Sequence, residues 1–416
     1  MAGVAVALLS GCGSAPRRTA RQGPPTSAVA AGPAFGLTED NANLLLSPSA
    51  AGAPAADGAG TFARARKQLS TLHPTYVRLL IDWAALQPAA DRPPDLEAQA
   101  SGCARTLRPC APYAGVRAEL EAIASQQRSG GGFTVVVVIF GTPAWAAQPT
   151  SGCERGGHGP FSRAPSPAGL RAYRSLIRAL IMLGAREGVA LDWWAPWNEP
   201  NDPTFLVPQR SVCAPGAPAL SPASYAALVR ATSAQLREEG GERHILLGEL
   251  NAYPSDTPDR IGITGFVAAL PADVLCAGAV WTLHAYAARA RSAPAGDPVA
   301  ALEAALDARG GCARQAKVWV TESGAGSAHP GDPRVRGEGD QRAGCLALAS
   351  QLATWAADPR VGAVFQYTFR DDPAFPVGLV DARLSRDYPA YRLWLAWSRA
   401  RAGGAPPQAS AGACSG

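Results

Sequence analysis

Two glutamates follow short apolar segments of the sequence and could act on one substrate together. The segment "LDWWAPWNEPND" (191–202) is typical of a buried strand, and it stops at Asn198-Glu199-Pro200, where proline removes a backbone donor. The segment "KVWVTESGAG" (317–326) carries Glu322 in a similar place. Two carboxyl groups across a cleft suit glycosidic bond cleavage, since one protonates the leaving oxygen while the other attacks the sugar carbon. A gap of about 5–5.5 Å favours retention of configuration, and about 6.5–9.5 Å favours inversion.

The two glutamates are 322 − 199 = 123 residues apart, so the fold must bring them together. Short apolar segments alternate with longer amphipathic ones, and "FTVVVVIF" (133–140) is typical of a strand buried on both faces. The expected strands are 35–38, 76–83, 133–140, 191–197, 244–250, 279–286, 317–321 and 361–369, and the expected helices are 61–72, 113–128, 166–187, 221–239, 261–270, 298–308, 339–356 and 388–401. This alternation predicts the α/β class and a (β/α)8 TIM barrel with a single catalytic domain. The alternative, a doubly wound open sheet, lacks a glycine-rich nucleotide turn after its first strand.

The segments after the predicted strands are long, whereas those after the helices are short. In a barrel the loops after the strands gather at one face and form the active site, so we expect Glu199 and Glu322 at that face. Val318 and Val320 share the parity of Glu322, which should therefore point inward if these valines do. Asn198 and Glu199 are adjacent, so both face the cleft only if the strand is bulged or already ending there.

These motifs, at these strand ends, resemble the glycoside hydrolases of clan A over roughly residues 34–400. "GTPAWA" (141–146) and "GLVD" (378–381) most resemble family 39 and its neighbours. The resemblance implies that Glu199 is the acid/base and Glu322 the nucleophile of a retaining enzyme. It also implies that no cofactor is needed.

The resemblance extends to the residues expected around the sugar. Asn198 corresponds to the asparagine that binds the substrate 2-hydroxyl, and Arg78 to the arginine that keeps the nucleophile ionised. His284 and Tyr286 correspond to a His-x-Tyr pair whose tyrosine binds the nucleophile. A structural ion pair for Arg78, and core positions for His284 and Tyr286, are the alternatives.

Five further residues have less certain places in the predicted site. Clan A enzymes usually place a tryptophan at the end of the eighth strand, where "VFQYTFRDD" offers Tyr367 or Phe369 instead. Trp145 follows the third strand and could either stack on a sugar or pack in the fold. Glu249 and Asn251 end the fifth strand and could line the cleft, although structural roles are expected for both.

The cysteines indicate export. Cys12 follows Leu9-Ser10-Gly11, which resembles a bacterial lipobox with lipidation at Cys12, although no basic residue precedes it within this segment. Of nine cysteines, eight remain without Cys12, and an even number in an exported chain indicates disulfides. We expect Cys103 and Cys110 to staple one loop, and Cys153 to pair with Cys213 across the loops after strands three and four.

The expected organisation is a signal and lipobox segment (1–12), a flexible tether (13–33), the barrel (34–401) and a C-terminal tail (402–416). The net charge of +5 includes no dense basic run with interleaved aromatic residues, so nucleic acid is not an expected partner. Five scattered histidines and the lack of a Cys-x-x-Cys pair predict no metal site. Membrane contact is expected only through a lipid at Cys12, and no feature predicts an oligomeric state.

The predicted function is double-displacement hydrolysis of an O-glycosidic bond in an extracellular polysaccharide or glycoside. One alternative is a transglycosylase that uses the same residues. Another is a carbohydrate-binding lipoprotein without catalytic activity, although the presence of both glutamates counts against it.

Overall fold

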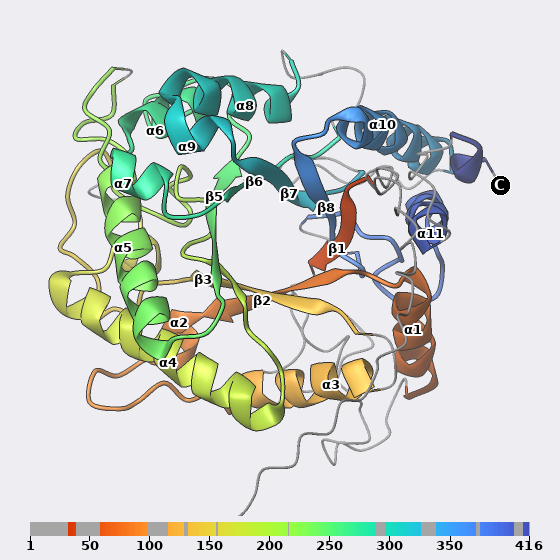
Figure 1. The fold of residues 1–416 in the computed structure, drawn as a ribbon, viewed down its shortest axis with the longest axis horizontal. Helices are drawn as coiled ribbons and strands as arrows, with labels where there is room; N and C mark the ends of the chain where they lie inside the picture. Colours follow the sequence, from red (N-terminus) through yellow and green to blue (C-terminus); the bar gives the residue numbers. More distant parts are fainter. Residues whose placement is uncertain are drawn as a thin grey trace, which may run out of the picture.

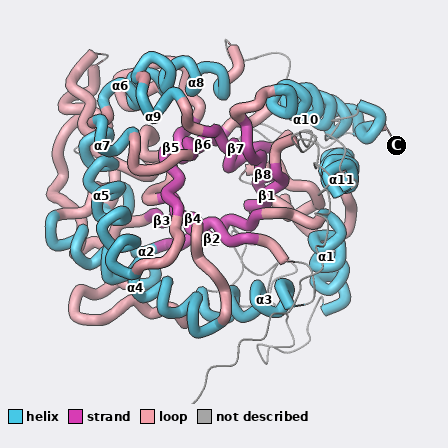
Figure 2. Tube along the Cα trace, viewed as in Figure 1, coloured by secondary structure: helices cyan, strands magenta, loops and turns pink. Residues whose placement is uncertain are grey.

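Eight parallel strands form a closed barrel in sequence order, with helices around it (Figures 1 and 2). This confirms the predicted (β/α)8 barrel. The computed structural model describes residues 32–38, 59–98, 115–128, 132–154, 157–214, 216–287, 296–325, 338–371, 375–402 and 411–415. Cys12, Cys103 and Cys110, together with most of the predicted N-terminal segments, lie outside these ranges.

The observed elements follow the predicted alternation closely. The strands are β1 (Ala34–Thr38), β2 (Tyr76–Asp82), β3 (Thr134–Phe140), β4 (Trp193–Ala195), β5 (His244–Asn251), β6 (Val280–His284), β7 (Lys317–Ser323) and β8 (Val361–Tyr367). The helices are α1 (Ala59–Leu72), α2 (Trp83–Leu86), α3 (Val116–Arg128), α4 (Pro167–Glu187), α5 (Ser221–Glu239), α6 (Ile263–Ala269), α7 (Ala272–Leu275), α8 (Pro298–Arg309), α9 (Gly311–Arg314), α10 (Glu338–Ala357) and α11 (Pro389–Ala402). Two short 3-10 turns, η3 (Pro160–Ser162) and η4 (Ala411–Cys414), complete the described elements.

Strand β4 is shorter than the predicted strand over 191–197. It ends at Ala195 because the next residue, Pro196, has no N–H to continue the ladder. The chain beyond Pro196 is therefore released from strand geometry before it reaches Asn198 and Glu199.

The strands have two apolar faces. Their outward side chains, such as Val77 and Val135, pack with the helices in one large cluster. Their inward side chains form a smaller cluster inside the barrel. Four aromatic residues, which we call the aromatic floor, dominate this inner cluster: Tyr76, Trp193, Trp319 and Phe365. The ring of Trp319 lies 4.7 Å from the rings of both Tyr76 and Trp193.

The aromatic floor requires a glycine on β1. Gly36 pairs in register with Phe365 on β8, and a Cβ atom at Gly36 would lie 2.2 Å from Cδ1 of the phenylalanine ring. No real side chain tolerates that separation, so the ring of Phe365 occupies the volume that a residue at position 36 would need.

Disulfides link segments that are distant in sequence. Cys153–Cys213 joins the loops after β3 and β4, which confirms this predicted pair. Cys276–Cys312 and Cys345–Cys414 are two further bridges. The last one attaches η4 to α10, so part of the predicted C-terminal tail packs on the barrel helices.

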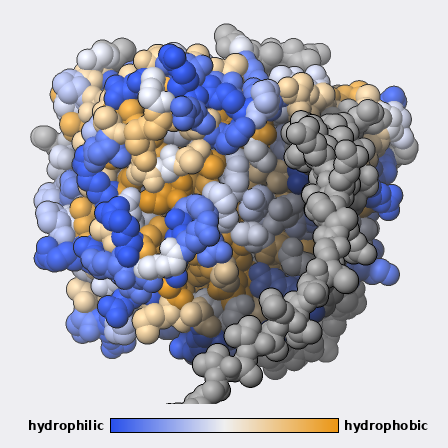
Figure 3. All heavy atoms as spheres, in the orientation of Figure 1, coloured by the Kyte–Doolittle hydropathy of each residue, from blue (hydrophilic) through white to orange (hydrophobic). Residues whose placement is uncertain are grey.

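Hydrophilic residues cover much of the outer helices in the face shown in Figure 3, and hydrophobic residues gather nearer its middle. A cavity of about 580 Å³ lies at the N-terminal ends of β5 and β6, where Trp193, His244 and Cys276 are among the lining residues. This is the end of the barrel opposite to the loops that carry Glu199 and Glu322. Within the described ranges, no helix is both long and apolar enough to cross a membrane.

Gly36→Ala should lower the free energy of unfolding by about 1–3 kcal/mol, because the new methyl group overpacks the ring of Phe365. Denaturant unfolding measures this change. Gly157→Ala is the matched control, because no atom lies within 4 Å of a Cβ built there. Equal stability of the two variants would contradict the close packing of the aromatic floor.

Candidate active site

Glu199 lies on the loop that begins where β4 ends. Its φ of 38° is in the left-handed region, and its carbonyl accepts a hydrogen bond from the N–H of Asp202 at 2.9 Å. The N–H of Asn198 donates to the carbonyl of Ile139 at 3.2 Å, which keeps the loop beside β3. Because the strand has already ended, Asn198 and Glu199 are free of strict alternation and both turn toward the site.

Glu322 reaches the site through an irregularity in β7. The expectation that Val318 and Val320 point inward is wrong, since both belong to the outer cluster and Trp319 is the inward residue. Strict alternation from Trp319 would direct Glu322 outward. The register with β6 shifts instead, from Leu283↔Val320 to His284↔Glu322, so β7 advances two residues while β6 advances one. This bulge re-aims Glu322 toward the interior.

Arg78 on β2 is the centre of the site and is 1% exposed. Its Nη1 donates to Glu322 Oε1 at 2.7 Å and to Thr38 at 3.2 Å. Its Nη2 donates to Asn198 Oδ1 at 3.2 Å and also to Glu249 Oε2. Burial alone would lower the pKa of Arg78, but the charges of Glu249 and Glu322 outweigh burial and raise this pKa above its ordinary value. The guanidinium therefore stays charged and orients side chains from four other strands or strand ends.

Glu249 has a larger part in the site than its sequence position predicted. It was expected to be structural, and it is fully buried, yet its carboxylate contacts both Arg78 and His284. Burial raises the pKa of Glu249, but the charge of Arg78 and then the contacts with His284 lower it to about 2. A carboxylate in the apolar run "HILLGELN" needs a buried cationic partner, and that was the signal available in the sequence.

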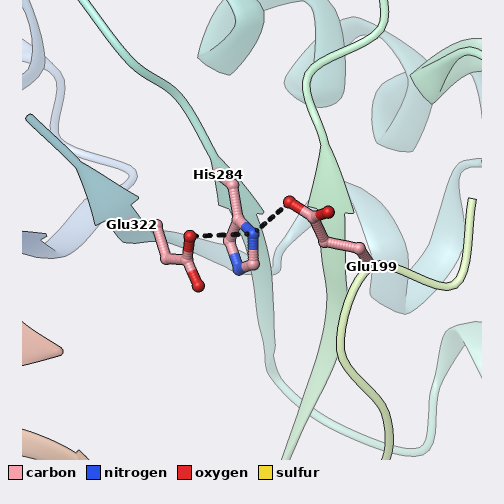
Figure 4. Close-up of side chains that lie close together, drawn as sticks. All are labelled: Glu199, His284 and Glu322. Carbon is pink, nitrogen blue, oxygen red and sulfur yellow. Dashed lines mark hydrogen bonds and ion pairs between the residues drawn. The ribbon is translucent and has the colours of Figure 1, made fainter. Parts of the chain in front are cut away.

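His284 at the end of β6 lies between the two candidate catalytic glutamates, as Figure 4 shows. Its Nδ1 is 2.7 Å from Glu199 Oε1 and 3.4 Å from Glu322 Oε2, and its Nε2 is 3.0 Å from Glu249 Oε2. Burial lowers the pKa of His284, but the charge of Glu322 and the hydrogen bonds to Glu199 and Glu249 raise it to about 10. These contacts favour the imidazolium form of the ring, in which both nitrogens donate.

Tyr286 connects the nucleophile candidate to an aromatic group. Its hydroxyl donates to Glu322 Oε2, and burial followed by the charge of Glu322 keeps its pKa well above 10. Its ring lies 6.3 Å from Tyr367 and 5.0 Å from Phe375. Tyr367 is thus next to the site, whereas Phe369, the other residue considered there, is fully buried in the outer cluster.

Trp145 lies apart from this group. Its Nε1 donates to the carbonyl of Gln87 at 2.9 Å, and its ring packs edge-on against Trp83. It packs on the outer cluster, between the barrel and the helices. These contacts hold the partly buried ring of Trp145 in place, and its role in sugar stacking stays a prediction.

The surroundings of Glu199 favour its protonated form. Arg78 and His284 supply two positive charges, and Glu249 is ionised. Both oxygens of Glu322 accept hydrogen bonds, from Arg78 and Tyr286. Burial raises the pKa of Glu199, and the negative charge of Glu322 raises it as well. The contacts with His284 lower this pKa but do not cancel the rise. The arrangement therefore separates one acidic carboxyl from one ionised carboxylate.

Of the three glutamates and two basic residues of the site, Glu199 and Glu322 are the two that reach the surface. Their side chains are 12% and 10% exposed, whereas those of Arg78, Glu249 and His284 are at most 1% exposed. One carboxylate oxygen of each lies within 4.8 Å of the other. A pair of opposed carboxyl groups thus lies at the mouth, above a buried layer of charges.

A metal ion is the competing use of Glu199, His284 and Glu322, whose donor atoms lie within 4.8 Å of one another. A histidine ligand must be neutral, whereas the carboxylates beside both nitrogens of His284 favour its protonated form. Glu322 already accepts from Arg78, a cation that would repel a metal. The ion pair between Arg78 and Glu322 thus disfavours a metal ion here, and the expected absence of a metal site stays a prediction.

Comparisons with known proteins bear on the fold. No family model matches the chain, and no curated protein matches its sequence. Among solved structures, a family 39 glycoside hydrolase from the gut symbiont Bacteroides cellulosilyticus WH2 superposes with a TM-score of 0.53 at 16% identity, over 88% of this chain and 63% of that one. The exo-β-1,4-mannosidase Op5Man5 from Opitutaceae bacterium strain TAV5 gives 0.50 at 16% identity, over 89% and 60%.

The catalytic domain of GH30 xylanase C from Talaromyces cellulolyticus gives a TM-score of 0.52 at 14% identity, over 91% of this chain and 77% of that one. The chain spans less than two thirds of the length of the first two proteins. At these identities the likeness is one of fold. The barrel is thus shared with glycoside hydrolases of families 39 and 30, in line with the resemblance read from the motifs.

The free energy of unfolding should fall as the pH rises from about 6.5 toward 10. His284 has its pKa raised from 6.5 to about 10 by folding, so its stabilising contribution is complete below pH 6.5 and is lost as the pH rises through that interval. The loss is at most about 1.4 kcal/mol per pH unit. Urea unfolding of the wild type and His284→Gln across this range measures it, and the variant should show the flatter profile. Parallel profiles would contradict a protonated His284.

Proposed function

We propose that this protein is a retaining glycoside hydrolase that cleaves O-glycosidic bonds by double displacement. The observation that carries the proposal is the pair of carboxyl groups at the barrel mouth, with one oxygen of Glu199 within 4.8 Å of one oxygen of Glu322. Retaining enzymes place these groups about 5–5.5 Å apart, whereas an inverting enzyme needs a wider gap to admit water.

In the first step, Glu199 gives its proton to the glycosidic oxygen as the bond between that oxygen and the anomeric carbon breaks. Glu322 forms a new bond from its carboxylate to the anomeric carbon, which leaves a glycosyl ester. Arg78 and Tyr286 hold the attacking carboxylate in place. When Glu322 loses its charge, Arg78 stays paired with Glu249, so no buried cation is left alone.

In the second step, Glu199 takes a proton from water, which attacks the anomeric carbon and breaks the ester bond to Glu322. Glu199 changes from acid to base because Glu322 loses its negative charge when the ester forms. The negative charge of Glu322 raises the pKa of Glu199, and that charge is absent in the glycosyl ester. The contact with His284 lowers the pKa of Glu199 throughout. Glu199 is accordingly an acid in the free enzyme and a base in the intermediate.

Two further side chains complete the proposed sugar site. The amide oxygen of Asn198 accepts from Arg78, so its NH₂ group is left to donate to a sugar hydroxyl. Tyr367 packs near Tyr286 and is the proposed aromatic surface beneath the sugar, in place of the usual tryptophan.

We also propose that the chain acts outside the cytoplasm, with a lipid at Cys12 and residues 13–33 as a tether to the barrel. The three described disulfides support an oxidising compartment. The substrate is proposed to be an extracellular polysaccharide or glycoside.

Glu322→Gln should lower kcat on aryl glycosides at least about 1,000-fold, because the amide cannot form the glycosyl ester. Glu199→Ala should lower kcat/KM about 100- to 10,000-fold on substrates with poor leaving groups, because acid assistance is lost. Azide should restore part of the turnover of Glu199→Ala and give a glycosyl azide of retained configuration. A panel of aryl glycosides with good and with poor leaving groups, with product anomers followed by NMR, measures these effects.

Glu97→Gln, an exposed carboxylate on the surface, is the control and should match the wild type. Equal turnover by the wild type and Glu322→Gln would overturn the proposal and favour a carbohydrate-binding protein. Predominant transfer to added sugar acceptors, rather than to water, would identify a transglycosylase.

A further inference from the structure

Glu249 forms a third carboxylate in the site, beneath the two at the mouth. Its side chain is 0% exposed, so it does not reach a substrate. Its Oε2 accepts hydrogen bonds from both Arg78 and His284, the two buried cations. No step of the proposed reaction uses Glu249 directly, so its position requires a separate explanation.

The backbone of β5 is irregular where it carries Glu249. From Leu247 to Leu250, β5 advances three residues while its partner β6 advances two, from Trp281 to Leu283. Strand β5 therefore contains one extra residue there. Gly248 has a φ of 103°, and Glu249 itself has a φ of 52°, which is unfavourable for a residue with a side chain. The N–H of Glu249 is satisfied by Thr282 Oγ1 at 2.6 Å. The fold accepts local strain in order to direct this carboxylate inward.

The proton count of His284 decides where the proton of Glu199 resides. A neutral imidazole has one N–H and one lone pair. If Nε2 donated to Glu249 and the ring were neutral, the lone pair of Nδ1 would face Glu199 Oε1 at 2.7 Å and accept the proton that the substrate needs. If both nitrogens carry protons, Nδ1 donates to Oε1 and the proton of Glu199 lies on Oε2.

The groups that surround His284 come from several elements. Glu199 faces it from the loop after β4, Glu249 from β5 and Glu322 from β7. Arg78 on β2 is paired with both Glu249 and Glu322, so it reduces the negative field on the ring. Glu249 is the one of the three carboxylates whose charge is unchanged through the proposed reaction, because Glu199 and Glu322 each become neutral at one stage.

We propose that Glu249 is a positioning residue that keeps His284 doubly protonated, so that Nδ1 always donates to Oε1 of Glu199 and the catalytic proton stays on Oε2. The inference rests on the proposed glycosidase function for its kinetic consequence. Its physical content, the protonation of His284, is independent of any substrate.

The kinetic test uses Glu249→Gln in the full chain with two aryl glycosides of the same sugar. A 2,4-dinitrophenolate leaving group needs no acid, whereas a 4-methoxyphenolate does. We expect kcat/KM to fall about 100-fold or more for the methoxyphenyl substrate and less than about 10-fold for the dinitrophenyl one. Glu119→Gln, a buried glutamate on α3, is the matched control and should change neither. Equal losses on both substrates would overturn the proposal, because they would indicate general damage or an effect on Glu322.

The spectroscopic test reads His284 directly by ¹⁵N NMR at neutral pH, with assignment from His284→Gln. Both ring nitrogens should be protonated in the wild type and in Glu249→Asp, which keeps the carboxylate, and one should lose its proton in Glu249→Gln. A singly protonated ring in the wild type overturns the proposal even if Glu249→Gln does not fold. A doubly protonated ring in folded Glu249→Gln also overturns it. If the wild type shows no glycosidase activity but the ring behaves as expected, the proposed function fails while the role of Glu249 in protonating His284 stands.

Discussion

The site depends on one constraint: the charge of a guanidinium buried in the barrel must be compensated by nearby acidic and polar groups. Arg78 is removed from water, and an unpaired charge there would cost several kcal/mol. Glu322, Glu249 and Asn198 supply its partners from three other parts of the barrel. The same contacts that compensate for its burial fix the attacking carboxylate and orient the asparagine. The stability of the charged layer and the geometry of the proposed reaction are therefore one property of the fold.

A regular barrel would not build this site. Regular alternation directs Arg78 and His284 inward, since Arg78 shares parity with Tyr76 on β2 and His284 shares parity with the inward Val280 on β6. Glu249 and Glu322 turn inward only because β5 and β7 each contain an extra residue, and Glu199 turns because Pro196 ends β4 early. Irregular backbone near the mouth thus places the three acidic side chains, whereas regular strands place the two basic ones.

The contrast between regular and irregular strands explains which features the sequence could predict. The barrel and most element bounds were predictable because the apolar periodicity repeats eight times. The rim positions of Glu199 and Glu322 followed from strand ends, and the Cys153–Cys213 bridge from neighbouring loops. The parity argument for Glu322 failed because a bulge is a pairing event between two strands, and the pattern of one strand does not reveal it. Glu249 was underrated for the same reason, since its partners lie on β2 and β6.

The aromatic floor has a consequence for how the site communicates with solvent. Tyr76, Trp193, Trp319 and Phe365 fill the barrel beneath Arg78, and none of them offers a chain of polar groups along which a proton could pass. Among the described residues of the charged layer, Glu199 and Glu322 are the two that water can touch. Within the described part of the chain, these two carboxyls connect His284 to solvent. A ligand seated across the mouth would cover both of them and so slow the exchange of protons between the imidazole ring and water.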